Sequence, residues 1–256
     1  VRTDSLAKLN HDIDRYTGTY RHTRYPRATM DKTGVLIGQI GAELPIWKDA
    51  GQYLVMYDHK GDPRRMVQVQ PQLFRSVDDD YYMAFRESRE GKITHLFTNG
   101  ITAFEKTPWL YTTGVQRVIG LLCLLFIGIV FLLYLTKIIR AKIKGYGINP
   151  LFKTSGEISG LLLLHFGGFG IVFNFLIPPR EMMAGFPYGM PRLLYVVQLI
   201  PYLSAVWLGY YAYRVVKTTV RNREARAEIL YYILYIGMVV VYFNFLHYWN
   251  LLGWRF

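Results

Sequence analysis

The stretch GVQRVIGLLCLLFIGIVFLLYLT, residues 114–136, decides the fold. Its length predicts a helix that crosses the ~30 Å hydrocarbon layer of a bilayer, because an α-helix rises ~1.5 Å per residue. Arg117 is its only charged residue, and it lies near one end, where a long side chain can reach the interface. Together with three further apolar runs, this stretch predicts a four-span transmembrane domain over residues 111–256. The further runs are at about 158–177, 193–216 and 227–249.

Two clusters of basic residues lie in alternate loops between these runs. Short loops rich in Lys and Arg stay on the cytoplasmic side of a membrane. Both loops are therefore predicted to be cytoplasmic, which puts residues 1–113 and the C-terminus outside. The clusters are Lys137, Arg140, Lys142, Lys144 and Lys153 in the first loop, and Arg214, Lys217, Arg221, Arg223 and Arg226 in the second.

The net charge of +12 comes mainly from the membrane half. Residues 1–113 hold 16 Lys/Arg and 14 Asp/Glu, whereas residues 114–256 hold 14 and 4. Because most of the latter basic residues lie in the two loops, we expect no nucleic-acid partner. Cys123, the single cysteine, lies in the first apolar run, which excludes an intrachain disulfide and a Cys-based metal site. No metal and no cofactor are predicted.

The N-terminal half carries a β pattern over residues 15–110. Turn signals such as Thr98-Asn99-Gly100 separate short alternating or β-branched segments, which predicts an antiparallel meander closed into a small barrel or half-barrel. Residues 1–14 are expected to form a linker or short helix, and Lys32–Ile40 a helix or a strand. The fold class is therefore α+β, an N-terminal antiparallel β-barrel or half-barrel followed by a four-helix transmembrane bundle. The predicted strand segments are Tyr16–Tyr25, Leu44–Trp47, Gln52–Tyr57, Met66–Val69, Leu73–Ser76, Tyr81–Arg86, Ile93–Phe97 and Ala103–Glu105.

Several phrases of this half resemble the C-terminal region of bacterial serine hydrolases of the β-lactamase/penicillin-binding-protein family. In the membrane-anchored members of that family, a catalytic domain is followed by a lipocalin-like β-domain and then by several transmembrane helices. The order of segments in this chain looks the same from the β pattern onward. The phrases are Asp14–Arg21 (DRYTGTYR), Thr23–Tyr25 (TRY), Pro71–Arg75 (PQLFR), Ala84–Glu87 (AFRE), Gly91–Phe97 (GKITHLF) and Phe104–Trp109 (FEKTPW).

The catalytic domain of that family has no counterpart here. Its chemistry uses a Ser-x-x-Lys nucleophile, a Tyr-x-Asn or Ser-x-Asn element and a Lys-Thr-Gly strand. Ser5–Lys8, Lys32–Gly34 and Tyr242–Asn244 match these patterns by letter. The first two are too close in sequence to frame a catalytic domain, and the third lies in a predicted membrane helix. We therefore predict no catalytic residue in this chain, although the parent protein would be a serine hydrolase, β-lactamase-like or D-peptidase-like.

A basic run near the first predicted strand is a candidate docking or ligand surface. It consists of Arg21, His22, Arg24 and Arg27, interleaved with tyrosines. Such a run suits an anionic ligand or the catalytic domain of the hydrolase. The alternative is a solvated strand face paired with Asp78–Asp80.

Polar residues inside the predicted spans are candidates for function or for helix packing. Asn174 and Asn244 lie in matching phrases, VFNFL and YFNFL, at similar predicted depth. The matching phrases suggest either a duplicated helical hairpin or a coincidence of sequence, and the two amides are expected to bond across the helices if these helices are neighbours. His165, beside several glycines, is expected to be a packing histidine with a hydrogen-bond partner, and Gln198 to stabilise helix association.

The sequence therefore predicts a noncatalytic membrane anchor and accessory β-domain of an extracytoplasmic serine hydrolase, in a bacterial plasma membrane. No apolar segment precedes residue 114, so we expect an export signal and the hydrolase domain before Val1 in a longer protein, or a hydrolase on a separate chain. The alternative is a stand-alone membrane protein whose outer β-domain binds a ligand or partner. A transporter is disfavoured, because no charged residue lies near the middle of a span.

Overall fold

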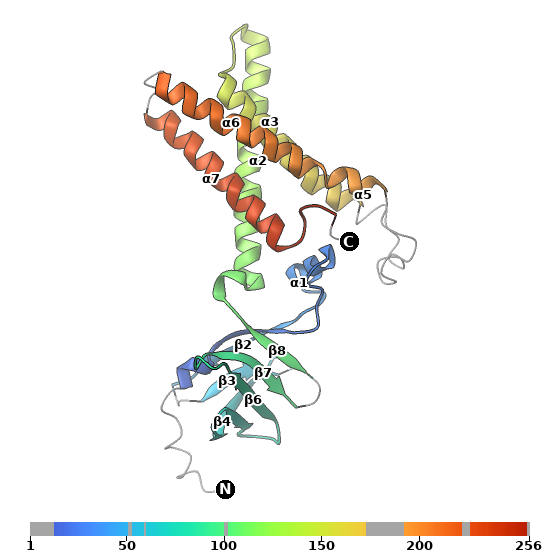
Figure 1. The fold of residues 1–256 in the computed structure, drawn as a ribbon, viewed down its shortest axis with the longest axis vertical. Coiled ribbons are helices and arrows are strands. Elements are labelled where there is room, and N and C mark those ends of the chain that lie inside the picture. Colours follow the sequence, from blue (N-terminus) through green and yellow to red (C-terminus); the bar gives the residue numbers. More distant parts are fainter. Residues whose placement is uncertain are drawn as a thin grey trace. The chain divides into compact units, whose positions relative to one another are not determined.

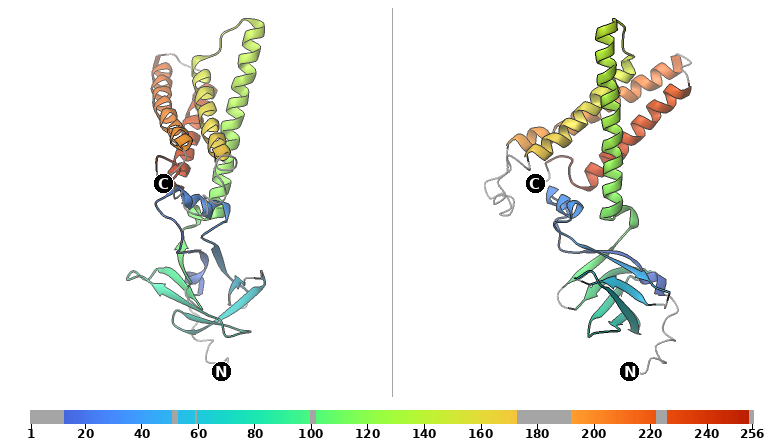
Figure 2. Two further views of the ribbon diagram at one scale, coloured as in Figure 1. Left: turned by 90° about the vertical axis from the view of Figure 1, so that its right-hand side faces the viewer. Right: turned by 180° about the vertical axis from the view of Figure 1, so that it is seen from behind.

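The computed structural model describes residues 13–50, 53–58, 60–99, 102–172, 192–221 and 226–254. The chain divides into two compact units (Figure 1 and Figure 2). The first comprises Val1–Arg27 and Asp31–Arg117, and the second Ala28–Met30 and Val118–Phe256. The strands lie in the first unit and most of the helical residues in the second, which confirms the α+β class.

The first unit contains a closed barrel of antiparallel strands in sequential order. Each strand pairs with the next along the chain, and β1 pairs with β8 to close the barrel. The predicted meander is therefore confirmed in its closed form rather than as a half-barrel. The strands are β1 (Gly18–His22), β2 (Glu43–Lys48), β3 (Leu54–Tyr57), β4 (Pro63–Gln70), β5 (Leu73–Ser76), β6 (Tyr82–Glu87), β7 (Ile93–Thr98) and β8 (Ala103–Thr107).

The segment Lys32–Ile40, predicted as a helix or a strand, is a short helix. A 3-10 turn, η3 (Met30–Lys32), leads directly into α1 (Thr33–Ile37). Gly38 ends α1 with a φ of 83°, a left-handed conformation that glycine adopts without the steric cost of a Cβ. Its amide donates to the carbonyl oxygen of Val35 at 3.1 Å, which closes the last turn.

Side chains fill the barrel interior. The Tyr16 ring, at the end of the 3-10 turn η2 (Ile13–Tyr16), lies 4.9 Å from the rings of both Phe74 and Phe85. A barrel of this strand number is just wide enough for its own side chains to occupy the centre. The described part of the barrel is therefore held together by a packed core. The buried core residues are Ile13, Tyr16, Tyr20, Ile46, Leu54, Met56, Met66, Phe74, Met83, Phe85, Ile93 and Leu96.

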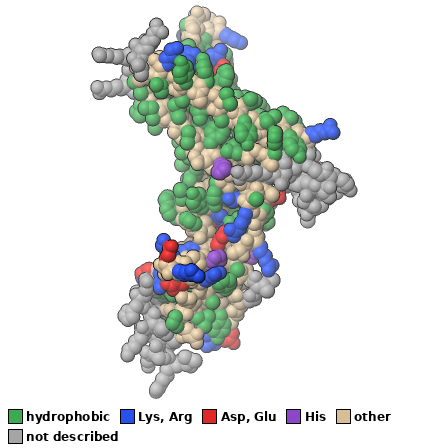
Figure 3. Space-filling view, viewed as in Figure 1, with side chains coloured by type: hydrophobic (Ala, Val, Ile, Leu, Met, Phe, Trp, Pro, Cys, Tyr) green, Lys and Arg blue, Asp and Glu red, His purple; other side chains and the backbone are tan. Residues whose placement is uncertain are grey.

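Three helical stretches are long and apolar enough to cross a membrane, namely Thr113–Lys144, Arg192–Thr219 and Glu228–Tyr248. Apolar side chains cover much of the visible surface of the helical unit (Figure 3), as expected for helices surrounded by lipid. Helix α3 is not among the three over its described length, so the fourth span stays a prediction. The long helices are α2 (Thr113–Lys144), α3 (Pro150–Ile171), α5 (Arg192–Val197), α6 (Ile200–Arg221) and α7 (Arg226–Tyr248).

The third predicted span is interrupted by a turn at Gln198–Leu199, between α5 and α6. Pro201 is the physical cause. A proline has no backbone N–H to donate, and its ring clashes with the carbonyl four residues earlier, here that of Val197. The span predicted at about 193–216 is confirmed as a helical stretch apolar enough to cross a membrane, with this turn within it.

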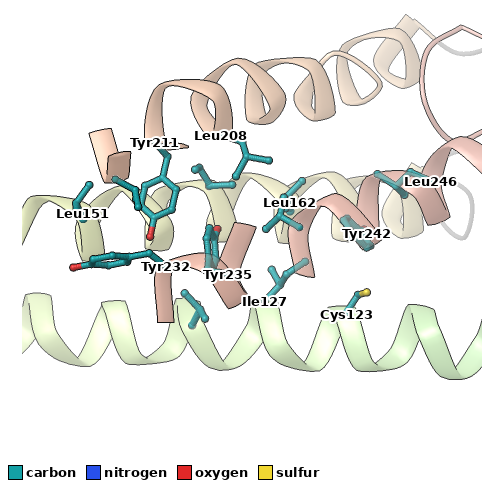
Figure 4. Close-up of a cluster of buried hydrophobic side chains, with 14 residues drawn as sticks. Cys123, Ile127, Leu151, Leu162, Leu208, Tyr211, Tyr232, Tyr235, Tyr242 and Leu246 are labelled. Atoms are coloured by element: carbon teal, nitrogen blue, oxygen red, sulfur yellow. The ribbon is translucent and has the colours of Figure 1, made fainter. Parts of the chain in front are cut away.

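Tyrosine side chains dominate the core where α3, α6 and α7 meet. The Tyr235 hydroxyl donates to the carbonyl oxygen of Ser155 at 2.7 Å and lies 3.0 Å from Ser159 Oγ. Tyr211 and Tyr235 pack edge to face, with ring centroids 5.5 Å apart (Figure 4). Because most of these hydroxyls find partners on neighbouring helices, the core is specified by directional bonds as well as by packing.

Two glycines of α3 let aromatic side chains of α2 lie against its backbone. A Cβ on Gly156 would fall 2.1 Å from Tyr134 Cγ, and a Cβ on Gly160 would fall 2.8 Å from Phe131 Cε2. No larger residue fits at Gly156 unless the helices move. The Gly-x-x-x-Gly spacing is typical of close packing between membrane helices.

Candidate functional site

The predicted basic run begins on β1, the strand that closes the barrel. In the sheet, Arg21 stands opposite Glu43 of β2 and also opposite Glu105 of β8. Tyr20, its neighbour, is fully buried in the barrel core. Since side chains alternate along a strand, Arg21 faces away from that core. It is nevertheless only 2% exposed, so other parts of the chain cover it.

Arg21 is held by a carboxylate and a backbone carbonyl. Its Nη2 and Nε lie 2.7 and 3.1 Å from Glu43 Oε1, and Nη2 also donates to the carbonyl oxygen of Tyr111 at 2.5 Å. A buried charge is tolerated only when it is paired and hydrogen-bonded. Arg21 therefore serves an internal contact and is not available at a surface.

Glu43 binds the first residue of α2 as well as Arg21. The Thr113 amide nitrogen lies 3.0 Å from Glu43 Oε2 and 3.1 Å from Oε1, and Thr113 Oγ1 donates to Oε2 at 2.8 Å. The first amides of a helix lack partners within the helix, and a negative charge there is favourable to the helix dipole. We call Arg21, Glu43, Tyr111 and Thr113 the barrel–helix joint, because they connect β1 and β2 to the start of α2.

A second polar cluster lies on the same side of the barrel. The Tyr25 hydroxyl donates to Glu105 Oε1 at 2.7 Å, and Arg27 Nη2 donates to Glu105 Oε2 at 2.7 Å. Burial raises the pKa of Tyr25, and its hydrogen bond to Glu105 adds to the rise. That same carboxylate raises the pKa of Arg27. This cluster fixes the chain between β1 and α1 against β8.

The predicted docking surface is thus divided by the fold. Arg21 is buried and Arg27 is paired with Glu105, whereas the Arg24 side chain is exposed. His22 is partly buried, and its Nδ1 accepts a hydrogen bond from the Arg24 amide at 3.1 Å. The alternative pairing with Asp78–Asp80 is not seen among the described residues. Asp79 and Asp80 instead pair with Arg64 and Arg75.

A groove on the barrel surface offers a site that the sequence did not indicate. It has a volume of ≈ 600 Å³ and runs along β1, β7, β8 and the turn that follows β8. His95, Lys106 and the largely exposed Trp109 line it. The Lys106 Nζ donates to the carbonyl oxygen of Arg15 at 2.8 Å, and burial lowers the pKa of this amine. We call this feature the barrel groove.

Of the two intramembrane amides, Asn174 and Asn244, the structure describes only Asn244. Asn174 lies outside the described residues. The Asn244 side chain is exposed, and its Nδ2 donates to the carbonyl oxygen of Val240, one turn earlier in α7. This bond within one helix satisfies the amide donor, and the contact across two helices stays a prediction.

His165 and Gln198 are buried in the helical unit, at 2% and 0% exposure. Neither imidazole nitrogen of His165, and neither terminal atom of Gln198, has a hydrogen-bond partner among the described residues. His165 was expected to be hydrogen-bonded; no bond of standard geometry is seen within the described part of the chain, although the Gln198 side chain is close enough to interact with the imidazole. Gly168, one turn after His165, packs against Val197. A Cβ added at Gly168 would lie 3.3 Å from Val197 Cγ2.

The three motif-like segments do not assemble into a site within the described residues. Ser5–Lys8 lies outside them. Lys32–Gly34 forms the junction of η3 and α1 rather than a strand, and Tyr242–Asn244 lies within α7. No catalytic set is therefore built from these segments in the part of the chain that the structure describes.

Comparison with known proteins found no match to any family model, to any curated protein or to any solved structure. A function is therefore argued from the geometry of the barrel–helix joint and the barrel groove, together with the sequence resemblance described above.

The joint was missed by the sequence patterns because its members are far apart in the chain. Glu43 and Thr113 are 70 residues apart. One signal was present: a threonine pair, Thr112-Thr113, directly precedes the apolar run, and threonine is a common residue at helix starts. That signal locates the helix start but not the carboxylate that binds it.

Proposed function

We propose that this chain is the noncatalytic membrane anchor and accessory β-domain of an extracytoplasmic serine hydrolase of the β-lactamase/penicillin-binding-protein family. The barrel would act as a platform that holds the catalytic domain at the outer face of a bacterial plasma membrane. A four-span bundle formed by α2, α3, α5–α6 and α7 would provide the anchor. The catalytic domain would lie upstream in the same gene or on a separate chain.

The barrel–helix joint is the main observation in support of the platform role. It ties a barrel with a filled interior to the first turn of α2 through the buried Arg21–Glu43 pair. A binding domain of the lipocalin type would be expected to hold its ligand inside. A filled barrel fastened to an apolar helix instead favours a part whose task is to position something else.

The hydrolase assignment rests on the resemblance of the sequence phrases. Most of these phrases lie on elements of the barrel: Asp14–Arg21 on η2 and β1, Ala84–Glu87 on β6, and Gly91–Phe97 on β7 and the turn before it. The order of a β-domain followed by apolar helices also fits the membrane-anchored members of that family. Both points support the proposal without identifying the substrate.

The proposed topology can be tested by cysteine labelling in intact cells. In a Cys123→Ser background, Val77→Cys places a thiol on an exposed barrel turn, and Lys144→Cys places one in the first basic loop. A membrane-impermeant maleimide should label Val77→Cys in intact cells and Lys144→Cys only after permeabilisation. Labelling of Lys144→Cys in intact cells would refute cytoplasmic basic loops.

The hydrolase partnership can be tested with an active-site-directed probe. Native membranes are treated with a fluorescent fluorophosphonate, solubilised, and precipitated with an antibody against the barrel. The expected product is a labelled polypeptide that either contains this chain or is bound to it. Precipitates without label, from membranes in which other serine hydrolases are labelled, would overturn the partnership.

The barrel groove supports a second candidate, a stand-alone protein whose outer domain binds a ligand or partner. The groove combines an imidazole, an amine and an exposed indole, which together suit a ligand with polar and apolar parts. Replacing Trp109 with Ala distinguishes the two functions. The second candidate expects a ligand-induced change in Trp fluorescence that Trp109→Ala abolishes, whereas the platform role expects no such change in the parent protein.

A further inference from the structure

A groove in the helical unit lies between the start of α3 and the middle of α6. It has a volume of ≈ 440 Å³, within the range of small-ligand sites. We call it the helix groove. It is lined by Pro150, Lys153, Thr154, Glu157, Trp207 and Tyr210.

The groove combines the residue types that lie at membrane interfaces. Trp207 and Tyr210 are partly exposed at 42% and 43%, and their rings lie 5.7 Å apart. Trp and Tyr are enriched at the level of lipid headgroups, because each has an apolar body and a polar tip. The helix groove therefore has an aromatic wall suited to the boundary between headgroup and acyl chain.

Positive charge flanks this wall from both helices. Lys153 lines the groove, and its side chain is 57% exposed. Arg214, one turn beyond Tyr210, donates from Nη1 to the Tyr210 hydroxyl at 2.7 Å, which holds the guanidinium at the rim. Both belong to the two basic clusters, and Lys and Arg gather at this end of the helices (Figure 3).

One carboxylate also faces the groove. Glu157 Oε1 lies 3.8 Å from the Lys153 Nζ, and Glu157 Oε2 accepts a weak hydrogen bond from Trp207 Nε1 at 3.4 Å. The Lys153 contact is long, so the amine keeps capacity for a second anion. With Arg214 included, the groove carries two cations and one anion, a net positive charge.

The first amides of α3 do not form the site. The Asn149 side chain accepts from the amides of Leu151 and Phe152, and its backbone carbonyl accepts from Lys153. The cationic side chains and the aromatic wall therefore have to supply the recognition.

We infer that the helix groove binds the headgroup of an anionic phospholipid. Lys153 and Arg214 would contact the phosphate, and Trp207 and Tyr210 would pack against the glycerol and the first carbons of the acyl chains. Basic pockets between membrane helices are known to take such headgroups. The inference shares with the proposed function only the placement of these helices in a bilayer, and it does not depend on a hydrolase or on the side that the loops face.

The test uses the full chain purified in detergent, with phosphatidylglycerol, phosphatidylcholine or inorganic phosphate added. Native mass spectrometry counts bound lipid, and thermal unfolding measures stabilisation. We expect phosphatidylglycerol to bind and to raise the unfolding temperature more than phosphatidylcholine does. Equal effects of the two lipids, or equal stabilisation by inorganic phosphate, would overturn an anionic lipid site.

Substitutions of the lysine and arginine at the helix groove test whether the lipid binds there. Lys153→Gln and Arg214→Gln should each weaken phosphatidylglycerol binding about five-fold, the factor for one basic contact with an anionic surface. Lys153→Arg should restore binding, because it keeps the charge. Lys142→Gln, an exposed member of the first basic cluster outside the groove, serves as the control. Weakening by Lys142→Gln as large as by Lys153→Gln would show diffuse attraction and overturn the site.

A misfolded variant cannot be mistaken for a loss of binding. Each variant must first show the unfolding temperature of the parent protein in the absence of lipid. If Arg214→Gln fails this requirement because of its bond to Tyr210, Lys153→Gln and Lys153→Arg alone decide the outcome. A failure of the hydrolase co-precipitation would leave these results unchanged.

Discussion

The Glu43 carboxylate, on strand β2, receives hydrogen bonds from both the amide and the hydroxyl of Thr113, the first residue of helix α2. The same carboxylate neutralises the buried Arg21 guanidinium. One side chain thus satisfies a buried charge and the start of an apolar helix. This double role makes the joint sensitive to a single substitution.

Glu43→Ala should lower the free energy of unfolding by about 3–5 kcal/mol, because it removes the carboxylate that pairs with the buried Arg21. Hydrogen exchange at the Thr113 amide should accelerate as well, because that amide loses its acceptor. Glu90→Ala is the control, since Glu90 is largely exposed and its contact with Lys92 is a surface ion pair. Similar losses in the two variants would contradict the role of the joint.

Phe74→Ala should destabilise the barrel by about 3–5 kcal/mol, since it empties the centre of an aromatic cluster. Phe74 is fully buried and lies in edge contact with Tyr16 and Phe85. Val77→Ala, at an exposed turn, should change stability by less than about 0.5 kcal/mol. Chemical denaturation followed by circular dichroism measures both. A small loss for Phe74→Ala would indicate a loosely filled interior.

Tyr20→Phe should alter how stability depends on alkaline pH. Burial raises the pKa of Tyr20 in the folded protein above its usual value of 10.0. Above about pH 10 the unfolded chain loses this proton while the folded chain keeps it, so the unfolded state is favoured as pH rises.

The Tyr20 hydroxyl donates to the carbonyl oxygen of Tyr16 at 2.7 Å. At pH 8 the Tyr20→Phe variant should therefore be about 1 kcal/mol less stable than the parent protein. This difference should shrink between pH 10 and pH 11, because the variant has no phenol to ionise at this position. Unfolding midpoints at each pH give the comparison, and a constant difference would argue against a shifted phenol.

Gly156→Ala should disrupt the packing of α2 against α3. The added methyl group would overlap the Tyr134 ring, and overpacking of this kind costs about 1–3 kcal/mol. Gly128→Ala is the matched control, since an added Cβ there meets nothing within 4 Å. Alanine also favours a helix over glycine by up to about 1 kcal/mol, so the control should be neutral or stabilised. Thermal unfolding in detergent distinguishes the two outcomes.

Gln198→Leu and Gln116→Leu should have effects of opposite sign. Gln198 is fully buried, and its amide forms no hydrogen bond of standard geometry among the described residues, so an apolar replacement removes a poorly compensated polar group. Gln116 is also buried, but its Nε2 donates to the carbonyl oxygen of Leu110 at 2.8 Å. We expect stabilisation of about 1 kcal/mol in the first variant and a similar loss in the second. A loss in both would mean that Gln198 has a partner in the folded protein.

Local composition was sufficient to predict the main elements. The apolar run at 114–136 predicted the apolar part of α2, and turn signals such as Thr98-Asn99-Gly100 separated segments that became strands of the barrel. These patterns involve only a few neighbouring residues, and they indicate where helices and strands begin and end. The break at Gln198–Leu199 could also have been predicted, because Pro201 is visible in the sequence.

Contacts between distant elements could not be predicted in the same way. Alternation along β1 correctly separates Tyr20 from Arg21 onto two faces, but it cannot say that Tyr111 and Glu43 cover the outer face. Arg21 was therefore interpreted as a surface residue. The same limit applies to Gly156, whose contact with Tyr134 depends on how two helices meet.

Pairing of β1 with β8 leaves the barrel without an unpaired strand edge. A partner therefore cannot be recruited by β-augmentation, in which an extended peptide adds to an open sheet through backbone hydrogen bonds. Recognition must use side chains and loops instead, and its specificity can be changed by point substitution. The same closure protects the domain from edge-to-edge aggregation.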